Sequence, residues 1–163
     1  MEAVQKVTDI QKLMIECGHT QHLTRERSLT KYSEKYTELV QEGWEQQLFK
    51  FVFQTLSLQF SSKEWEYRFG AVQVAVKTLS QTQLKHDDEV FVEVRAMLFE
   101  KCGIMLIDPE FRVRNIIGDI MQKLIEIDGA QVYQKFRDHL FRNIQATFNR
   151  DPKGTDASSN QSK

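Results

Sequence analysis

Apolar residues recur along the chain at intervals of three and four positions, which is the period of an amphipathic α-helix. The first of these stripes ends just before Gly18, and a glycine directly after an apolar stripe is typical of a helix C-terminus. The pattern predicts seven helices that together cover most of residues 4–148. Their apolar stripes start at Val4, Leu29, Trp44, Trp65, Val90, Val113 and Val132.

Short polar segments indicate where several of these helices begin. The run Ser-Ser-Lys-Glu at 61–64 resembles a capping box and predicts the start of the fourth helix. Asp87 or Asp88 is expected to cap the fifth helix, and Asp-Pro at 108–109 to open the sixth with proline at its first position. Gly118 falls inside the sixth helix, where glycine costs about 1 kcal/mol relative to alanine, so we expect a close helix crossing there.

Two segments of the chain match each other at an offset of 46 residues. Arg68 falls on Arg114, and a period in the forties with two helices per unit is typical of stacked helical repeats. Neighbouring units of such an array bury each other's apolar faces. The sequence therefore predicts an all-α fold of stacked helix pairs. The flanking positions that also coincide are Trp65 with Phe111, Ala71 with Ile117 and Leu79 with Ile125.

The segment Asp-Pro-Glu-Phe-Arg-Val-Arg at 108–114 resembles the turn and second-helix start of a repeat in the HEAT/armadillo-like family. The resemblance implies a right-handed α-solenoid of about three antiparallel helix pairs with a capping helix at the C-terminal end. It also implies a structural ladder between adjacent repeats, formed by Asp108 and Arg114, with Arg68 as the matching arginine of the preceding unit. That unit departs from the pattern, because Ser62 and Tyr67 stand where the aspartate and the valine would be.

Residues 1–150 are expected to form one repeat domain, and the polar residues 151–163 a disordered tail. The first helices lack an evident polar cap, and the third is apolar on several sides, so it is expected to be buried from several directions. Both features indicate a fragment or short isoform of a longer array. Self-association through an exposed end of the stack is a further alternative.

Charge and cysteine content exclude several classes of function. The 22 Lys and Arg residues balance 23 Asp and Glu residues, which leaves a net charge of −1 and no electrostatic footprint for nucleic acid or an anionic membrane. Cys17 and Cys102 lie far apart without a CxxC partner, and are expected to be buried thiols rather than zinc ligands. No stretch of eighteen apolar residues occurs. We therefore expect a cytoplasmic protein, with the nucleus as an alternative, that has no metal and no cofactor.

The chain contains none of the common phosphate-binding, dinucleotide-binding, zinc-hydrolase or acyl-enzyme motifs, so the prediction is that it is not an enzyme and has no catalytic residues. A non-enzymatic protein-interaction scaffold or adaptor is the leading hypothesis. Its concave face, lined by the second helices of successive pairs, would bind a helix or peptide of a protein partner. The partner-binding positions expected on the fourth and sixth helices are Glu66, Gln73, Lys77, Arg112, Asn115, Asp119, Gln122 and Lys123.

Two other functional classes remain open. A nucleic-acid-binding α-solenoid would need dispersed cations to converge on one face, which would give binding a steep salt dependence. A catalytic solenoid, such as the HEAT-like DNA glycosylases, is the less favoured alternative because no pocket acid stands out. The cations that the nucleic-acid hypothesis requires are Arg25, Arg27, Lys31, Arg68, Arg112, Arg114 and Arg142.

Overall fold

A computed structural model of the chain describes the backbone of residues 1–149 and the side chains of residues 1–146. This part of the chain forms seven α-helices and contains no strand, which confirms the predicted all-α class. The expectation of a disordered tail concerns residues 151–163, outside the described residues. The helices are α1 (Glu2–Glu16), α2 (His22–Gln41), α3 (Glu45–Gln59), α4 (Trp65–Gln81), α5 (Glu89–Met105), α6 (Phe111–Asp128) and α7 (Ala130–Asn149).

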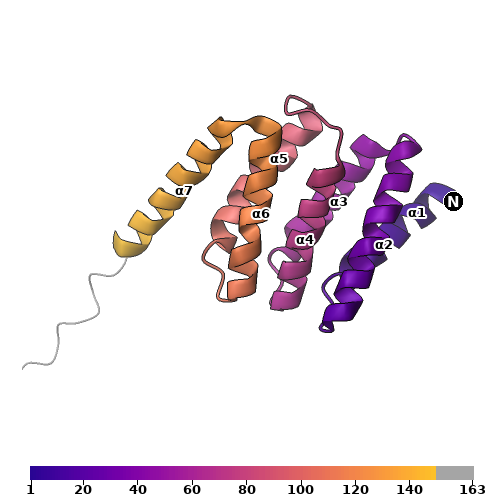
Figure 1. Cartoon of the computed structure of the whole chain (residues 1–163), viewed down its shortest axis with the longest axis horizontal. Helices are drawn as coiled ribbons and strands as arrows, with labels where there is room; N and C mark the ends of the chain where they lie inside the picture. The colour runs from indigo at the N-terminus through magenta and orange to yellow at the C-terminus, as the bar shows by residue number, and fades with distance from the viewer. Residues whose placement is uncertain (150–163) are drawn as a thin grey trace, which may run out of the picture.

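The helices are arranged in two layers, and consecutive helices run in opposite directions (Figure 1). One layer contains α2, α4 and α6, in which each helix packs against the next. The other contains α1, α3, α5 and α7 in the same order. Helix α7 touches both α5 and α6, and it lies at the end of the stack opposite the N-terminus (Figure 1).

The core lies between the two layers and is rich in aromatic side chains. Phe49 stacks on Phe91 across α3 and α5, with the ring centroids 6.1 Å apart. Tyr32 of α2 is fully buried, and its hydroxyl hydrogen-bonds the Thr78 hydroxyl of α4 at 2.6 Å. Helix α3 packs against α1, α2, α4 and α5, as expected for a helix buried from several directions, while Leu58 on its remaining face is 78% exposed.

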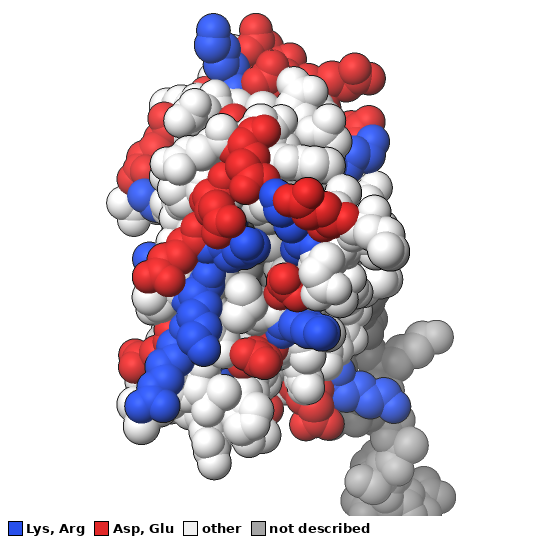
Figure 2. All heavy atoms as spheres, turned by 90° about the vertical axis from the view of Figure 1, so that its right-hand side faces the viewer, with Lys and Arg blue, Asp and Glu red and all other residues white. Residues whose placement is uncertain are grey.

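The end of the stack formed by α1 and α2 is covered with charged side chains of both signs, which lie in adjacent rows across it (Figure 2). Several of them pair with one another. Lys6 of α1 contacts Glu2 at 3.2 Å and Glu42 at 2.5 Å, and Lys35 contacts Glu38 within α2 at 3.0 Å. These charged pairs form a polar surface over the α1–α2 end of the stack.

The predicted capping box at 61–64 does not form. Helix α4 begins at Trp65, and the side chain of its N-cap residue, Glu64, accepts no capping hydrogen bond. Instead, the Ser62 hydroxyl accepts a hydrogen bond from the Glu64 backbone N–H at 3.3 Å. The Ser62 hydroxyl therefore stabilises the turn before α4, and this local hydrogen bond replaces the expected capping bond.

The starts of α5 and α6 also differ in detail from the prediction. Asp88 is the N-cap residue of α5, but its carboxylate accepts a hydrogen bond from the Lys85 N–H upstream instead of capping the helix. Pro109 is not the first residue of α6, since that helix begins at Phe111. The cap of α6 is Glu110, whose side chain accepts the Arg112 backbone N–H.

The prediction of a close helix crossing at Gly118 was wrong. A Cβ added there would meet no atom within 4 Å, and the position is exposed to solvent. The close approaches occur at three other glycines, and at the first of them, Gly18, an added Cβ would overlap Tyr67 of α4. A Cβ on Gly70 would overlap the Cys17 carbonyl, where α4 packs against the end of α1, and a Cβ on Gly103 would overlap the His139 ring of α7.

These two kinds of glycine predict opposite effects of adding one methyl group. Gly70→Ala should lower the free energy of unfolding by about 2 kcal/mol, because the backbone of α1 cannot move away without disturbing the core. Gly118→Ala should raise it by roughly 0.5–1 kcal/mol, because alanine favours an exposed helix. Urea denaturation of the two variants beside the wild type measures both changes. Equal effects of the same sign would contradict this packing.

Candidate interaction surface

The fourth residue of each of the helices α2, α4 and α6 is an arginine whose guanidinium hydrogen-bonds the turn before the helix. We call these three arginines the arginine anchors. The Nη1 of Arg25 donates to the carbonyls of His19 and Thr20 at 2.7 and 2.9 Å. Arg68 bonds the carbonyls six and five residues before it, both at 2.9 Å. Arg114 does the same with the carbonyls of residues 108 and 109. The anchors therefore occupy equivalent places in α2, α4 and α6.

The turns that the anchors hold are equivalent as well. In each turn, the side chain six residues before the arginine accepts the backbone N–H two residues further on. The acceptors are His19 Nδ1 at 3.0 Å, Ser62 Oγ at 3.3 Å and Asp108 Oδ1 at 2.9 Å. Every helix then starts three residues after its acceptor. The same local structure is thus built three times, although the acceptor changes from histidine to serine to aspartate.

An ion pair between Arg68 and Asp108 joins two successive units. The Arg68 Nε and Nη2 donate to the two carboxylate oxygens at 2.7 and 2.9 Å, and the two side chains are only 12% and 6% exposed. Burial alone would raise the pKa of Asp108, but the hydrogen bonds from Arg68 and from the Glu110 N–H, with the charges of Arg68 and Arg114, lower it below 3.8. Asp108 is therefore ionised at neutral pH.

The corresponding pair is missing one unit earlier. Ser62 stands where Asp108 stands in the next unit, so the Arg25 guanidinium has no carboxylate there. Arg25 is 6% exposed, and its Nε has no hydrogen-bond partner among the described residues. The guanidinium lies instead near the rings of Trp65 and Phe69, at 5.6 and 5.8 Å from the centroids. Cation–π contacts partly compensate for the absent acid.

The apolar stripe of the second helix was expected to start at Leu29, whereas α2 begins at His22 and therefore includes Arg25. The repeat of the arginine is present in the sequence, but its two intervals differ. Arg25 precedes Arg68 by 43 residues, while Arg68 precedes Arg114 by 46. The ladder expected from the resemblance involves Asp108 and Arg114. In the structure Asp108 pairs with Arg68, and Arg114 contacts the Asp108 backbone carbonyl.

A shallow groove opens between α4 and α6 on the outer surface of their layer. Its volume is about 320 Å³, and we call it the α4–α6 groove. At its edge the Arg112 guanidinium lies 3.8 Å from the centroid of the Trp65 ring, and it also pairs with Glu110 at 2.8 Å. Three predicted partner-binding residues thereby come together beside two apolar ones. The lining residues are Phe69, Arg112, Asn115, Ile116 and Asp119.

The other predicted partner-binding residues lie on the same two helices but outside the groove lining. Gln122 and Lys123 both hydrogen-bond Glu126, at 3.1 and 2.9 Å, on the exposed side of α6. Lys77 of α4 is exposed. The remaining two, Glu66 and Gln73, are half-buried on α4. The sequence analysis did not include Trp65, Phe69 and Ile116 among the binding residues, because aromatic and aliphatic residues in a helix normally indicate the core. In the structure all three are half-buried.

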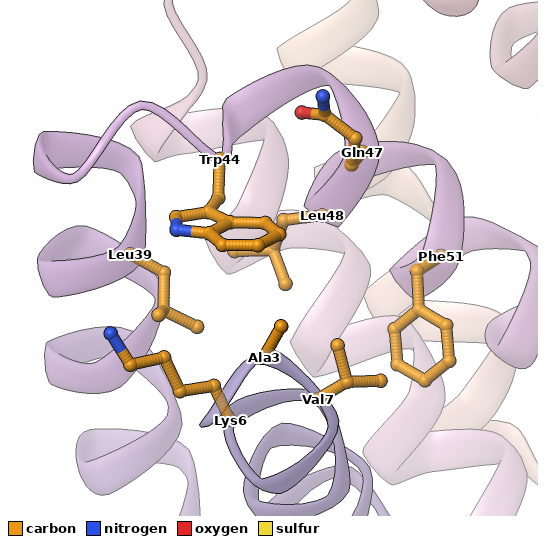
Figure 3. Close-up of a pocket in the computed structure, with 8 residues that line it drawn as sticks. All are labelled: Ala3, Lys6, Val7, Leu39, Trp44, Gln47, Leu48 and Phe51. Carbon is orange, nitrogen blue, oxygen red and sulfur yellow. The ribbon is translucent and has the colours of Figure 1, made fainter. Parts of the chain in front are cut away.

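A second hollow in the described residues is smaller and almost entirely apolar. An apolar pocket of about 70 Å³ lies between α1, α2 and α3, with Trp44 over one side and Val7 and Phe51 on the other (Figure 3). It is well below the size of a metabolite site. Among residues 1–146 no three His, Cys, Asp or Glu side chains cluster as a metal site would require. No helix in the described residues combines the length and hydropathy needed to cross a membrane.

The two cysteines are buried, as expected. Burial raises the pKa of the Cys102 thiol to about 12, and burial with the nearby Glu16 charge raises that of Cys17 to about 12. Both side chains are protonated at neutral pH and pack as small apolar groups. Neither cysteine is therefore a candidate nucleophile.

No protein-family model, curated protein or solved structure matches this chain. The interpretation of its surfaces accordingly depends on the geometry described above.

The missing ion pair predicts a stabilising substitution. Ser62→Asp should raise the free energy of unfolding by about 1 kcal/mol, because the new carboxylate would keep the turn hydrogen bond and meet the buried Arg25 guanidinium. Urea denaturation at pH 7 measures the gain. In an Arg25→Gln background the same change should give no gain, which separates the ion pair from a general effect of negative charge near a helix start. An equal gain in both backgrounds would contradict the equivalence of positions 62 and 108.

Proposed function

We propose that this protein is a non-enzymatic interaction scaffold built as a short right-handed α-solenoid of the HEAT/armadillo-like type. Its three helix pairs would be α1–α2, α3–α4 and α5–α6, with α7 at the C-terminal end. The three equivalent arginine anchors support the repeat interpretation, because unrelated helix pairs would have no reason to share one turn. We propose a cytoplasmic location, with the nucleus as the alternative.

The proposed binding site is the α4–α6 groove on the exposed side of the second helices. The observation that carries it is the stacking of Arg112 on Trp65 beside Phe69 and Ile116. Tryptophan and arginine contribute more than other residues to the binding energy of protein interfaces. Asp119 and Asn115 at the same site can bond polar groups of a peptide, so the surface suits a helix or peptide of mixed polarity.

Three of the seven cations that the nucleic-acid alternative requires, Arg25, Arg68 and Arg112, already have partners within the protein. Arg25 is buried and anchored to two carbonyls, and Arg68 is paired with Asp108. Arg112 is engaged by Trp65 and Glu110. Cations that already have partners release few counterions to phosphate, which is the main source of affinity for nucleic acids. A protein partner is therefore the proposal that the geometry favours.

Affinity capture with matched variants tests the groove. Arg112→Ala combined with Lys123→Ala should reduce the recovery of specific partners from a cell extract by immobilised protein, because Arg112 lines the groove and Lys123 lies further along the same helix. Quantitative mass spectrometry of the eluates compares the variant with the wild type. A loss of at least about tenfold in the amount of partner is expected for removal of a central arginine contact.

The control is Lys50→Ala combined with Glu93→Ala, which removes an exposed pair, 3.5 Å apart, from the layer on the other side of the molecule. This variant should capture the same partners as the wild type. Partner recovery that falls equally with both double variants, or with neither, would rule out the α4–α6 groove as the binding site.

A further inference from the structure

A buried arginine lacks an acid at the first joint, by which we mean the contact between α2 and the turn before α4. At the second joint, between α4 and the turn before α6, the Arg68 Nε and Nη2 hold both carboxylate oxygens of Asp108. Arg25 has the place of Arg68 at the first joint, and its Nε has no hydrogen-bond partner among residues 1–146. The residue is only 6% exposed, so water replaces little of the missing interaction. An oxyanion added here would therefore stabilise the first joint.

The residue that stands where the acid would be is Ser62. Its Oγ accepts the Glu64 backbone N–H at 3.3 Å, as Oδ1 of Asp108 accepts the Glu110 N–H at 2.9 Å. Both residues lie three positions before the first residue of the next helix. The two side chains thus leave the backbone at equivalent places, but the serine ends at its hydroxyl. A group attached to the hydroxyl oxygen would extend this side chain toward Arg25.

A phosphate group has the charge and the shape that this position requires. Phosphoserine carries a charge of about −1.5 to −2 at pH 7 and three strong acceptor oxygens. A guanidinium can bind phosphate through two parallel hydrogen bonds, as Arg68 binds Asp108. Helix α4 begins three residues after Ser62, and its N-cap residue Glu64 forms no side-chain capping bond. The positive end of the helix dipole therefore also favours a phosphate there.

The other charges around Ser62 are mostly positive. The Arg68 Nη1 donates to the Ser62 carbonyl at 2.9 Å, and Lys101 of α5 donates through Nζ to the hydroxyl of the neighbouring Ser61 at 3.3 Å. The acid nearest in the sequence is Glu64, which is exposed, so its repulsion of a phosphate is weakened by water and salt. The surroundings of the Ser62 hydroxyl thus favour the phosphorylated side chain.

The turn that carries Ser62 is accessible to an enzyme. It lies at the edge of the molecule where the three equivalent turns are found, between the end of α3 and the start of α4 (Figure 1). Ser62 itself is half-buried, and its neighbours Ser61, Lys63 and Glu64 are exposed. Modifying enzymes reach surface turns more easily than helices, because fewer contacts must open.

We propose that Ser62 is a phosphorylation site and that its phosphate, held by the Arg25 guanidinium, closes the first joint as Asp108 closes the second. A protein kinase would supply the phosphoryl group from ATP. The Ser62 hydroxyl oxygen bonds to the γ-phosphorus, the bond from this phosphorus to the β,γ-bridging oxygen breaks, and ADP leaves. The hydroxyl proton passes to a base of the kinase. The proposal does not depend on the function proposed for the α4–α6 groove.

A chain synthesised with phosphoserine in place of Ser62 tests the contact with Arg25. Urea denaturation at pH 7 should show a folding equilibrium constant at least about tenfold higher than that of the unmodified chain, because a charge-assisted pair replaces an unpaired buried cation. In an Arg25→Gln background the phosphate should give no such gain. The matched control carries phosphoserine in place of Ser61, and its effect should be the same in both backgrounds.

Phosphorus NMR gives a second measurement that needs no Arg25 variant. The second pKa of phosphoserine is ordinarily about 6, and a guanidinium in contact with the phosphate lowers it. In the folded chain, the pKa of a phosphate on Ser62 should therefore lie below that of a phosphate on Ser61. Equal pKa values at the two positions would contradict the contact with Arg25.

Peptide mapping by mass spectrometry tests whether the folded chain is a kinase substrate. The unmodified 163-residue chain, incubated with ATP and a cell extract that supplies protein kinases, should acquire phosphate on Ser62. A Ser62→Ala chain treated in the same way should lack the phosphate in the corresponding peptide. Absence of phosphate from Ser62 would overturn the proposal, and so would a gain in stability that is equal with and without Arg25.

Discussion

The fold depends on a repeated constraint at the start of each second helix, where one guanidinium bridges two carbonyls of the preceding turn. A turn of this kind leaves backbone carbonyls without partners inside the helix pair, and an arginine six residues later satisfies them while staying in the helix. The anchor fixes where the helix begins and the angle at which the chain enters it. Because the same contact occurs in α2, α4 and α6, these three helices start in register and can pack side by side.

The arginine anchors also determine which surfaces are left for binding. Arg68 points from α4 toward Asp108 in the turn before α6. The neighbouring Trp65 and Phe69 are half-buried on α4. Arg112 of the next unit then reaches back over Trp65. The groove thus follows from the equivalent positions of Arg68 and Arg114, since α4 contributes one side of it and α6 the other.

Much of this architecture could be predicted from the sequence. Seven helices, the layer of second helices and the importance of Arg68 and Arg114 follow from periodicity and from one 46-residue offset. The prediction failed at helix starts, where a side chain can form a local hydrogen bond in place of the expected cap. Ser62 resembles a cap but closes a turn, and Pro109 precedes the helix instead of starting it. Gly118 showed that glycine inside a helix does not by itself identify a crossing.

Three-dimensional information was essential for the rest. The groove combines Trp65 from one unit with Arg112 from the next, and no spacing rule within a single helix could bring them together. Arg25 was overlooked because the first interval between units is 43 residues and not 46. It also precedes the apolar stripe that starts at Leu29, although the folded chain buries it near the rings of Trp65 and Phe69. Aromatic residues that are half-buried, such as Phe69, or exposed, such as Tyr133, also resemble core positions until their neighbours are known.

A double-mutant cycle between Arg68 and Asp108 tests the central claim most directly. The cycle compares the unfolding free energies of the wild type, Arg68→Gln, Asp108→Asn and the double variant. The account predicts a coupling energy of about 1.5 kcal/mol or more at pH 7. Because the folded-state pKa of Asp108 lies below 3.8, this stabilisation is fully present above the unfolded-state pKa and is lost as the pH falls through the folded value. A coupling energy near zero at pH 7 would contradict the view that this pair joins successive units.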